Sequence, residues 1–275
     1  MSLWRSLFVE NPMLIEVRRY RRRLFGGSKP SGSNVAVLTL FGVCYLGLLL
    51  IVGNGNGSIP PIAIVLLQTG LFTLAAPALL NNAIAGERDK RTWDLLMVAP
   101  VTKAQVMIGK MAGAMTNLLI GAALFLLPIF ICAVSFTSTN YFNLAIAELN
   151  SLSFAILACA ITLFFSARCK RPFTALGMSL GLLLLGTMIY PLLIGALGFE
   201  GGGSERIVYD MLMIFHPFVA QYSLTLGDTA EVGFTSPVLQ IFVFVGLAAV
   251  ILVWTERTLN YSDNEVRFLG RKRHA

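Results

Sequence analysis

The chain carries little charge. Only 13% of its 275 residues are Asp, Glu, Lys or Arg, whereas 56% are hydrophobic. A soluble domain carries about a quarter charged residues, so a chain of this composition cannot cover a globular core for water. We therefore expect an integral membrane protein. The length allows one membrane domain and excludes an additional soluble catalytic domain of ordinary size.

Side chains that bind metals or perform catalysis are also scarce. The four cysteines (Cys44, Cys132, Cys159 and Cys169) form no CxxC pair, so neither a disulfide framework nor a metal site is indicated. The sequence contains no phosphate-binding GxxxxGK[ST] loop, no HExxH and no GxSxG. We expect no enzyme activity in this chain, no bound metal and no cofactor of its own. Of the two histidines, His216 is expected to make a local structural contact beside Pro217.

Ionisable residues inside the apolar runs are few and shallow, which argues against transport driven by an ion gradient. Lys110 lies early in its helix and can extend to the inner surface. Glu148 lies about one turn from the outer end of its helix, where we expect it to reach water. Glu256 and Arg257 lie at an inner helix end. The chain is therefore predicted to lack an energy source of its own.

The apolar runs predict an all-α membrane protein with six transmembrane helices, since about 20 residues cross a bilayer. We divide the chain into a cytoplasmic N-terminal segment (1–33), a six-helix transmembrane domain (34–256) and a basic cytoplasmic tail (257–275). The first run begins too late, after too many arginines, for a cleaved signal peptide. The expected spans are residues 34–53, 61–85, 106–135, 144–167, 173–198 and 238–255.

The 21 lysines and arginines are distributed unevenly over this topology. All except Arg206 fall on one side of the six expected spans. Because positive residues remain in the cytoplasm, both termini and the loop at 87–110 are predicted to lie inside the cell. Nucleic-acid binding is not expected, because no folded domain presents a basic patch.

The N-terminal segment is basic and amphipathic. Asn11 and Pro12 suit the start of a helix, and apolar residues then line one face. This pattern is typical of a helix lying in the inner membrane interface, although a disordered basic tail is the alternative. The residues expected to face lipid headgroups are Arg18, Arg19, Arg21, Arg22 and Arg23.

The longest loop, 199–237, is expected outside the cell. A seventh span is conceivable there, but it would place the C-terminal RKR outside, and His216–Pro217 interrupts the apolar run. We expect short re-entrant or interfacial helices over about 205–227 instead. Two GxxxG patterns, Gly109–Gly113 and Gly177–Gly181, permit close helix approach. Packing within one subunit is the favoured interpretation, and a dimer interface is the alternative.

Residues 87–100, ERDKRTWDLLMVAP, are highly charged between two long apolar runs. Glu87 suits the first turn of a helix, and Trp93, Leu96 and Met97 share a face. Pro100 ends this helix, and the sequence from Thr102 to Gln105 is a capping box that starts the next. We expect a short rigid helix, for which an ordinary interfacial anchor is the alternative.

This segment resembles the cytoplasmic signature of ABC-2 type permeases, the membrane subunits of ATP-driven exporters. Their pattern is roughly E-x-x-x-G-T-x-(D/E)-x-L-x-x-x-P, followed by G-K. Arg91 departs from it, since the family usually has Gly there. The basic N-terminal helix, six spans and long outer loop are similar too. The matching residues are Glu87, Thr92, Asp94, Leu96, Pro100, Gly109 and Lys110.

The resemblance implies that residues 87–100 form a coupling helix, which docks into a groove on a separate ATPase subunit that binds ATP and Mg²⁺. It also implies a second permease subunit, identical or not, with the first and fifth helices lining the route, in the cytoplasmic (inner) membrane of a bacterium. The candidate coupling residues are Glu87, Arg88, Thr92, Asp94, Leu95, Leu96, Pro100, Gly109 and Lys110.

Two other functions are compatible with the residues alone: a stand-alone ion-coupled carrier or channel, and a non-transporting membrane scaffold. The spans contain no ring of charge and no aromatic platform, so the sequence selects no class of substrate.

Overall fold

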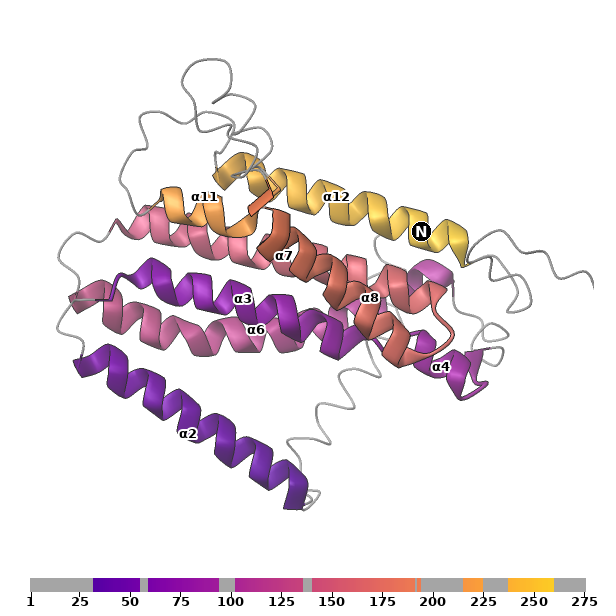
Figure 1. The fold of residues 1–275 in the computed structure, drawn as a ribbon, viewed down its shortest axis with the longest axis horizontal. Coiled ribbons are helices and arrows are strands. Elements are labelled where there is room, and N and C mark those ends of the chain that lie inside the picture. Colours follow the sequence, from indigo (N-terminus) through magenta and orange to yellow (C-terminus); the bar gives the residue numbers. More distant parts are fainter. Residues whose placement is uncertain are drawn as a thin grey trace, which may run out of the picture.

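A computed structural model describes residues 32–54, 59–93, 102–135, 140–190, 192–193, 215–224 and 237–259. Their secondary structure is helical (Figure 1). The expected N-terminal interfacial helix with its arginines and most of the basic tail lie outside the described residues. The elements are α2 (Gly32–Asn54), α3 (Pro61–Leu80), α4 (Ala85–Asp89), α6 (Lys103–Ser135), α7 (Tyr141–Arg168), α8 (Pro172–Leu184), the π-helical η2 (Leu185–Ile189), α11 (Pro217–Ser223) and α12 (Pro237–Thr258).

Five of the described helical segments are long and apolar enough to cross a membrane. The all-α, multi-pass membrane fold predicted from the sequence is confirmed. The first expected span coincides with α2, which has 23 residues. The five segments are Pro61–Asp89, Lys103–Ser135, Tyr141–Arg168, Pro172–Ile189 and Pro237–Thr258.

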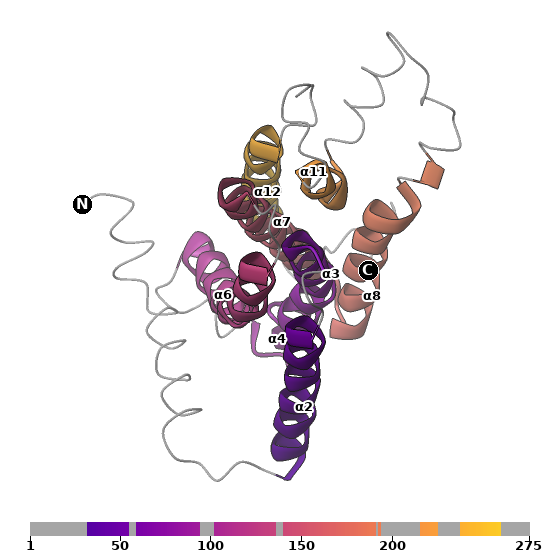
Figure 2. The same cartoon turned by 90° about the vertical axis from the view of Figure 1, so that its left-hand side faces the viewer.

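Helix α7 is the centre of the bundle, with α12, α3, α6 and α8 packed around it (Figures 1 and 2). Small residues on α7, among them Ala155, Ala158 and Ala160, are fully buried. Small side chains let neighbouring backbones approach closely, which favours van der Waals packing between helices in a membrane. The main core contains Phe72, Leu80, Leu118, Phe154, Leu163 and Phe244.

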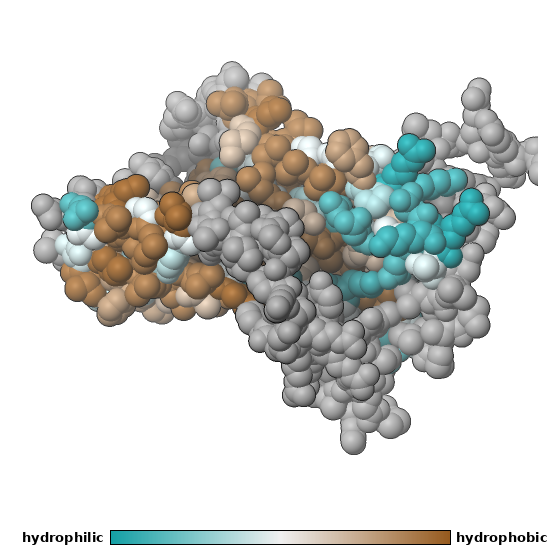
Figure 3. All heavy atoms as spheres, turned by 90° about the horizontal axis from the view of Figure 1, so that it is seen from below, coloured by the Kyte–Doolittle hydropathy of each residue, from teal (hydrophilic) through white to brown (hydrophobic). Residues whose placement is uncertain are grey.

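The outward surface of the bundle is apolar. Large side chains such as Phe130, Phe242 and Val250 are each more than 60% exposed. Figure 3 shows that the described flanks are mainly hydrophobic, while hydrophilic side chains gather at the end where Figure 1 places α4. An apolar flank of this extent suits a hydrocarbon environment and would be unfavourable in water.

Helix α2 lies apart from the bundle at its N-terminal end and approaches α6 farther along (Figure 1). The Tyr45 hydroxyl donates a hydrogen bond to the Leu124 carbonyl oxygen at 2.8 Å. Nearer its C-terminal end, Val52 packs in a second core cluster with Ile62 and Val65. The contacts of α2 with the described chain are thus concentrated toward the end of the bundle opposite α4.

The start of α6 confirms the predicted capping box. The Thr102 backbone N–H donates to Gln105 Oε1 at 2.9 Å, and the Gln105 N–H donates to Thr102 Oγ1 at 3.3 Å. This reciprocal pair satisfies two backbone donors that a helix start leaves free. The predicted boundary between the charged segment and the third span is therefore in place.

The Gly177–Gly181 pair does not pack against another described helix. A Cβ added at either glycine would meet no atom within 4 Å. The favoured interpretation, close packing within one subunit, is therefore wrong for this pair. The two glycines instead leave a face of α8 open.

A short helix lies between the fifth and last spans, in the region where the sequence predicts re-entrant helices. This helix, α11, has seven residues and packs against α3, α7 and α12 (Figure 2). Most of the rest of the segment 199–237 lies outside the described residues.

Candidate functional site

The helix that contains the start of the charged segment begins earlier than expected, and it does not continue through the whole segment. Helix α4 starts at Ala85, two residues before Glu87, and ends at Asp89. The predicted helix over 87–100 is wrong in this respect, because the chain turns at Lys90 and Arg91. Trp93 is again helical, and 94–101 lies outside the described residues.

The end of α4 has the geometry of a Schellman motif. Arg91 has a φ of 59°, in the left-handed region that favours glycine. The Thr92 N–H donates to the Glu87 carbonyl at 2.8 Å, and the Arg91 N–H donates to the Arg88 carbonyl at 3.0 Å. The pattern that this segment resembles has glycine at this position, and glycine would suit this backbone. Arg91 therefore adopts the turn at a steric cost.

The beginning of α4 is held by the hydroxyl of Ser166, near the end of α7. Ser166 Oγ accepts hydrogen bonds from the backbone N–H groups of Ile84 and Ala85 at 3.0 and 3.1 Å. It donates to the carbonyl oxygen of Asn81 at 2.9 Å. Ser166 is fully buried. One side chain thus satisfies three backbone groups at the break between α3 and α4.

Arg88 anchors α4 from its other side. Its Nη1 donates to the Ala167 carbonyl oxygen at 2.5 Å, and its guanidinium lies 5.4 Å from the ring centroid of Trp93. Both Arg88 and Trp93 are buried, and Trp93 belongs to the main core. Trp93, which the sequence places on a narrow apolar face of the helix, therefore points into the bundle.

Glu87 and Lys110 form an ion pair between α4 and α6. Lys110 Nζ donates to Glu87 Oε1 at 2.5 Å, and the two side chains are 30% and 21% exposed respectively. Gly109, directly before Lys110, is buried. The ion pair therefore joins Glu87, at the start of the sequence pattern, to the Gly109–Lys110 pair at its end.

Contacts with α8 complete the attachment of α4. Ala85 packs with Cys169 and Ala175 in a small core cluster. Burial raises the pKa of the Cys169 thiol, which the nearby Arg88 charge partly opposes. The thiol is therefore expected to stay protonated near neutral pH. The exposed residues of the region include Asp89, Lys90, Arg91, Thr92 and Thr102.

The structure brings together five of the nine candidate coupling residues: Glu87, Arg88, Thr92, Gly109 and Lys110. The other four, Asp94, Leu95, Leu96 and Pro100, lie outside the described residues. The short α4 is fastened to α6 by an ion pair and to α7 by hydrogen bonds. Such a rigid attachment transmits a displacement of α4 to these spans better than a solvated loop could.

A second region, in the half of the bundle away from α4, contains a buried polar network. Gln68, Thr69, Asn150, Gln221 and Gln240 are all fully buried. Thr69 and Gln221 bond at 3.0 Å, Gln221 and Asn150 at 3.5 Å, and Asn150 and Gln240 at 2.6 Å. These bonds connect α3, α11, α7 and α12. Because unpaired polar groups are costly away from water, the network favours one position of α11.

His216 ties the start of α11 to the fifth span. Its Nε2 lies 2.9 Å from the Thr187 carbonyl oxygen in η2, and its Nδ1 accepts from the Val219 N–H at 3.2 Å. Gln240 Nε2 donates to the His216 carbonyl oxygen at 2.8 Å. The structural role expected for His216 is confirmed. Burial lowers the pKa of the His216 imidazole, so the ring is neutral near pH 7.

Glu148 is less accessible than the sequence suggests. It lies in the second turn of α7, where Gln68 Nε2 donates to its Oε1 at 2.7 Å. Its Oε2 and Gln68 Oε1 are buried and have no hydrogen-bond partner among the described residues. Glu148 lies near the end of α7, as expected, and its carboxylate also forms a contact between α7 and α3.

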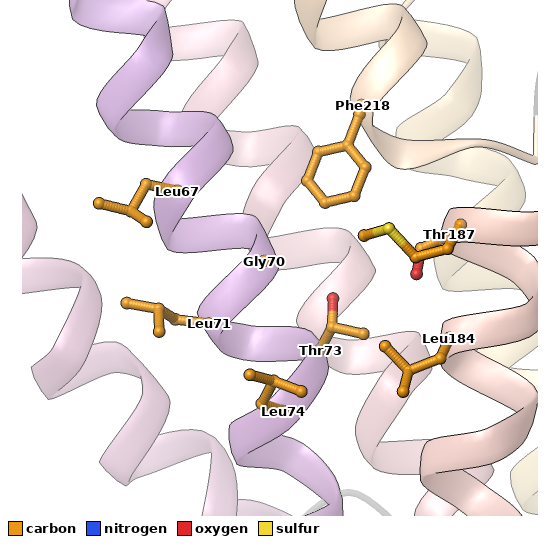
Figure 4. Close-up of a pocket in the computed structure, with 9 residues that line it drawn as sticks. Leu67, Gly70, Leu71, Thr73, Leu74, Leu184, Thr187 and Phe218 are labelled. Atoms are coloured by element: carbon orange, nitrogen blue, oxygen red, sulfur yellow. The ribbon is translucent and has the colours of Figure 1, made fainter.

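An apolar cavity of about 300 Å³ lies between α3, the end of α8 with η2, and α11 (Figure 4). Its two hydroxyls are already bonded within their own helices, Thr73 to Thr69 and Thr187 to Leu183. The two hydroxyls of the lining therefore have no free O–H donor for a ligand. Its lining residues are Leu67, Gly70, Leu71, Thr73, Leu74, Leu184, Thr187, Met188 and Phe218.

Sequence reasoning missed Ser166 and the polar network. A signal was present for the network, since isolated Gln and Asn residues inside apolar runs are costly unless paired and mark helix contacts. Ser166 gave no such signal, because a serine in a membrane helix usually bonds to its own backbone.

A model of the family described as "ABC-2 family transporter protein" matches residues 61–260, well over half of the chain. The match begins with α3 and includes α4, α6, α7, α8, α11 and α12. No curated protein matches the chain.

Proposed function

The chain belongs to the ABC-2 transporter family, and from that premise we propose that it is the permease subunit of an ATP-driven exporter. ATP and Mg²⁺ are bound by a separate ATPase subunit. The chain itself moves the substrate out of the cytoplasm and performs no hydrolysis. The absence of a phosphate-binding loop from the sequence supports this division of labour.

The attachment of α4 is the observation that supports the proposal most. Ser166 binds the backbone at the start of α4, and Arg88 binds the Ala167 carbonyl of α7. Glu87 forms the ion pair with Lys110 of α6. A force applied to the segment after Asp89 therefore reaches α6 and α7 together. The segment that follows carries the candidate contacts with the ATPase, namely Asp94, Leu95, Leu96 and Pro100.

We place the α4 end of the bundle in the cytoplasm of a bacterial cell, with both termini on the same side of the inner membrane. The distribution of lysine and arginine supports this orientation. In this orientation the polar network and α11 lie in the outer half, away from the ATPase. The N-terminal arginines (Arg18, Arg19, Arg21, Arg22 and Arg23) face the headgroups of the inner leaflet.

A second permease subunit, identical or not, is part of the proposal. The open face of α8 is a candidate surface for it, because Gly177 and Gly181 let a neighbouring helix approach closely. Large apolar side chains such as Phe173 and Leu182 are exposed on the same helix. Gly181→Leu is expected to weaken pairing of permease subunits in size-exclusion measurements without changing membrane insertion.

Affinity purification from the native membrane tests the proposal. We expect a soluble ATPase carrying a phosphate-binding loop to co-purify with the wild-type chain. Glu87→Ala and Leu96→Asp should uncouple transport from ATP hydrolysis while leaving insertion intact. Phe142→Ala, at the other end of the bundle, is the control and should keep coupling. Transport by the wild-type chain in liposomes without any ATPase would refute the proposal.

Replacing 87–100 with a Gly-Ser linker of equal length tests the scaffold alternative. The proposal requires that transport is lost. Retained cellular function would favour a scaffold that recruits partners through its basic face.

The second candidate function is an ion-coupled carrier, because the Oε2 of Glu148 is buried and has no hydrogen-bond partner in the part of the chain that the structure describes. Ion-driven carriers use ionisable groups of this kind. A proton gradient across ATPase-free liposomes distinguishes the two. Flux that Glu148→Gln abolishes would favour the carrier, and the permease proposal predicts no flux in either protein.

A further inference from the structure

Arg168, the last residue of α7, lies against two aromatic rings. Its guanidinium carbon is 4.3 Å from the ring centroid of Phe164 and 5.0 Å from that of Trp254. The two rings are 5.2 Å apart, which joins α7 to α12 at this end of the bundle. We call Phe164, Arg168 and Trp254 the arginine–aromatic cluster.

The cluster contains a cation without an anion. Among the described residues no hydrogen bond or ion pair involves the Arg168 side chain, and its Nε is buried without an acceptor. Aromatic rings attract the faces of a guanidinium but do not accept its in-plane N–H donors. That planar fork matches the oxygens of a carboxylate or a phosphate. An external anion would therefore complete the site.

The surroundings select the kind of anion. Three further cations are exposed nearby: Lys170 and Arg171 follow the end of α7, and Arg257 lies in the last turn of α12 beside the exposed Glu256. In the other direction α12 exposes Leu247, Val250 and Trp254, at 37%, 64% and 54%, along one helix face. Basic residues thus border an apolar strip that runs toward the middle of the bundle. A free anion would contact only the basic residues, whereas a phospholipid has a headgroup for the basic residues and an acyl chain for the apolar strip.

We propose that the arginine–aromatic cluster binds the phosphodiester of an anionic phospholipid, with an acyl chain along the exposed face of α12. In the orientation of the proposed function this lipid belongs to the inner leaflet. Arg168 directly follows Ser166 and Ala167, which hold α4. The bound lipid therefore fastens the end of α7 on which α4 is anchored.

Native mass spectrometry of the purified chain, without any ATPase, tests the proposal. The protein is titrated with phosphatidylglycerol and with phosphatidylcholine of the same acyl chains. Because charge-assisted hydrogen bonds are the strong ones, we expect the first phosphatidylglycerol to bind roughly tenfold more tightly than phosphatidylcholine. Arg168→Gln should abolish this preference, and Arg168→Lys, which keeps the charge but loses the fork, should retain part of it.

Lys90→Gln is the matched control, because it removes the same charge from an exposed position next to α4. It should leave the lipid preference unchanged. Equal losses in the two glutamine variants would overturn the proposal in favour of a diffuse basic surface, as would a wild-type protein without lipid preference.

Trp254→Leu provides a second test in case Arg168→Gln does not fold. This variant should weaken phosphatidylglycerol binding, and unchanged binding in a monodisperse sample would overturn the proposal. The measurement is separable from the proposed function. A failure of ATPase coupling leaves lipid binding unaffected, and a failure of lipid binding leaves the co-purification of an ATPase unaffected.

Discussion

The carboxylate of Glu87 and the ammonium of Lys110 meet at 2.5 Å, although 23 positions separate them in the sequence. The pair joins α4 to the first turns of α6. Because α4 directly follows α3, the contact closes a loop between the second and third spans. The two sides of the charged segment are therefore held together at its base.

Reversing this pair tests its contribution. Glu87→Lys and Lys110→Glu each place like charges together, and each should lower the free energy of unfolding by about 1 kcal/mol. The double exchange restores opposite charges and should recover most of the loss. Thermal unfolding in detergent measures both effects. Asp89→Asn, at an exposed position of α4, is the control and should have little effect.

Arg91→Gly is expected to stabilise the protein. A left-handed backbone costs a non-glycine residue about 1 kcal/mol, and glycine removes this cost. Lys90→Gly is the matched control, since Lys90 has a φ of −83° and gains nothing from glycine. The unfolding temperature should rise for Arg91→Gly and fall for Lys90→Gly. The opposite order would show that the turn at 90–92 differs from the structure.

Ser166→Ala should destabilise the junction of α3 and α4. It leaves the N–H groups of Ile84 and Ala85 without their acceptor, which costs about 2 kcal/mol for buried groups. Ser153→Ala is a matched control on the same helix, because among the described residues the buried Ser153 hydroxyl bonds only to the carbonyl of Asn150, in its own helix. Hydrogen exchange of residues 81–89 should accelerate in the first variant and stay unchanged in the second.

The docking of α11 is expected to weaken in acid. Burial lowers the pKa of His216 below its ordinary value of 6.5, so the folded state binds fewer protons than the unfolded state. Stability is thus full above that value and declines as the pH falls through it. The protection of residues 218–224 against hydrogen exchange, measured relative to the intrinsic exchange rate at each pH, should fall below about pH 6.5 in the wild type. In His216→Gln this loss of protection should be absent; an equal loss there would assign the effect to another group.

Local features of the fold could be predicted from the sequence. The capping box at Thr102 and Gln105 depends on four consecutive residues, and the structure contains it with both hydrogen bonds. The long apolar runs likewise predicted the membrane-spanning helices, because the length and composition of a run decide its membrane insertion. The pattern that the sequence resembles has glycine where this chain has Arg91, and Arg91 adopts the left-handed backbone that favours glycine.

Features that depend on packing could not be predicted. The pairing of Glu87 with Lys110 requires the positions of α4 and α6 relative to each other. The end of α4 at Asp89 was missed because the charged residues of 87–100 are all compatible with a helix, whereas the tertiary contacts of Arg88 and Ser166 favour a break. The direction of Trp93 is likewise decided by the main core, into which it packs.

Photo-crosslinking from position 89 tests the central claim most directly. Asp89 is exposed at the end of α4, and Phe142, 72% exposed, lies at the start of α7 and provides the matched position at the other end of the bundle. A photoreactive residue at 89 in native membranes should form a crosslink to an ATPase subunit that carries a phosphate-binding loop, and the same residue at 142 should not. A crosslink to that ATPase from 142 only, or from neither position while transport continues, would contradict the account.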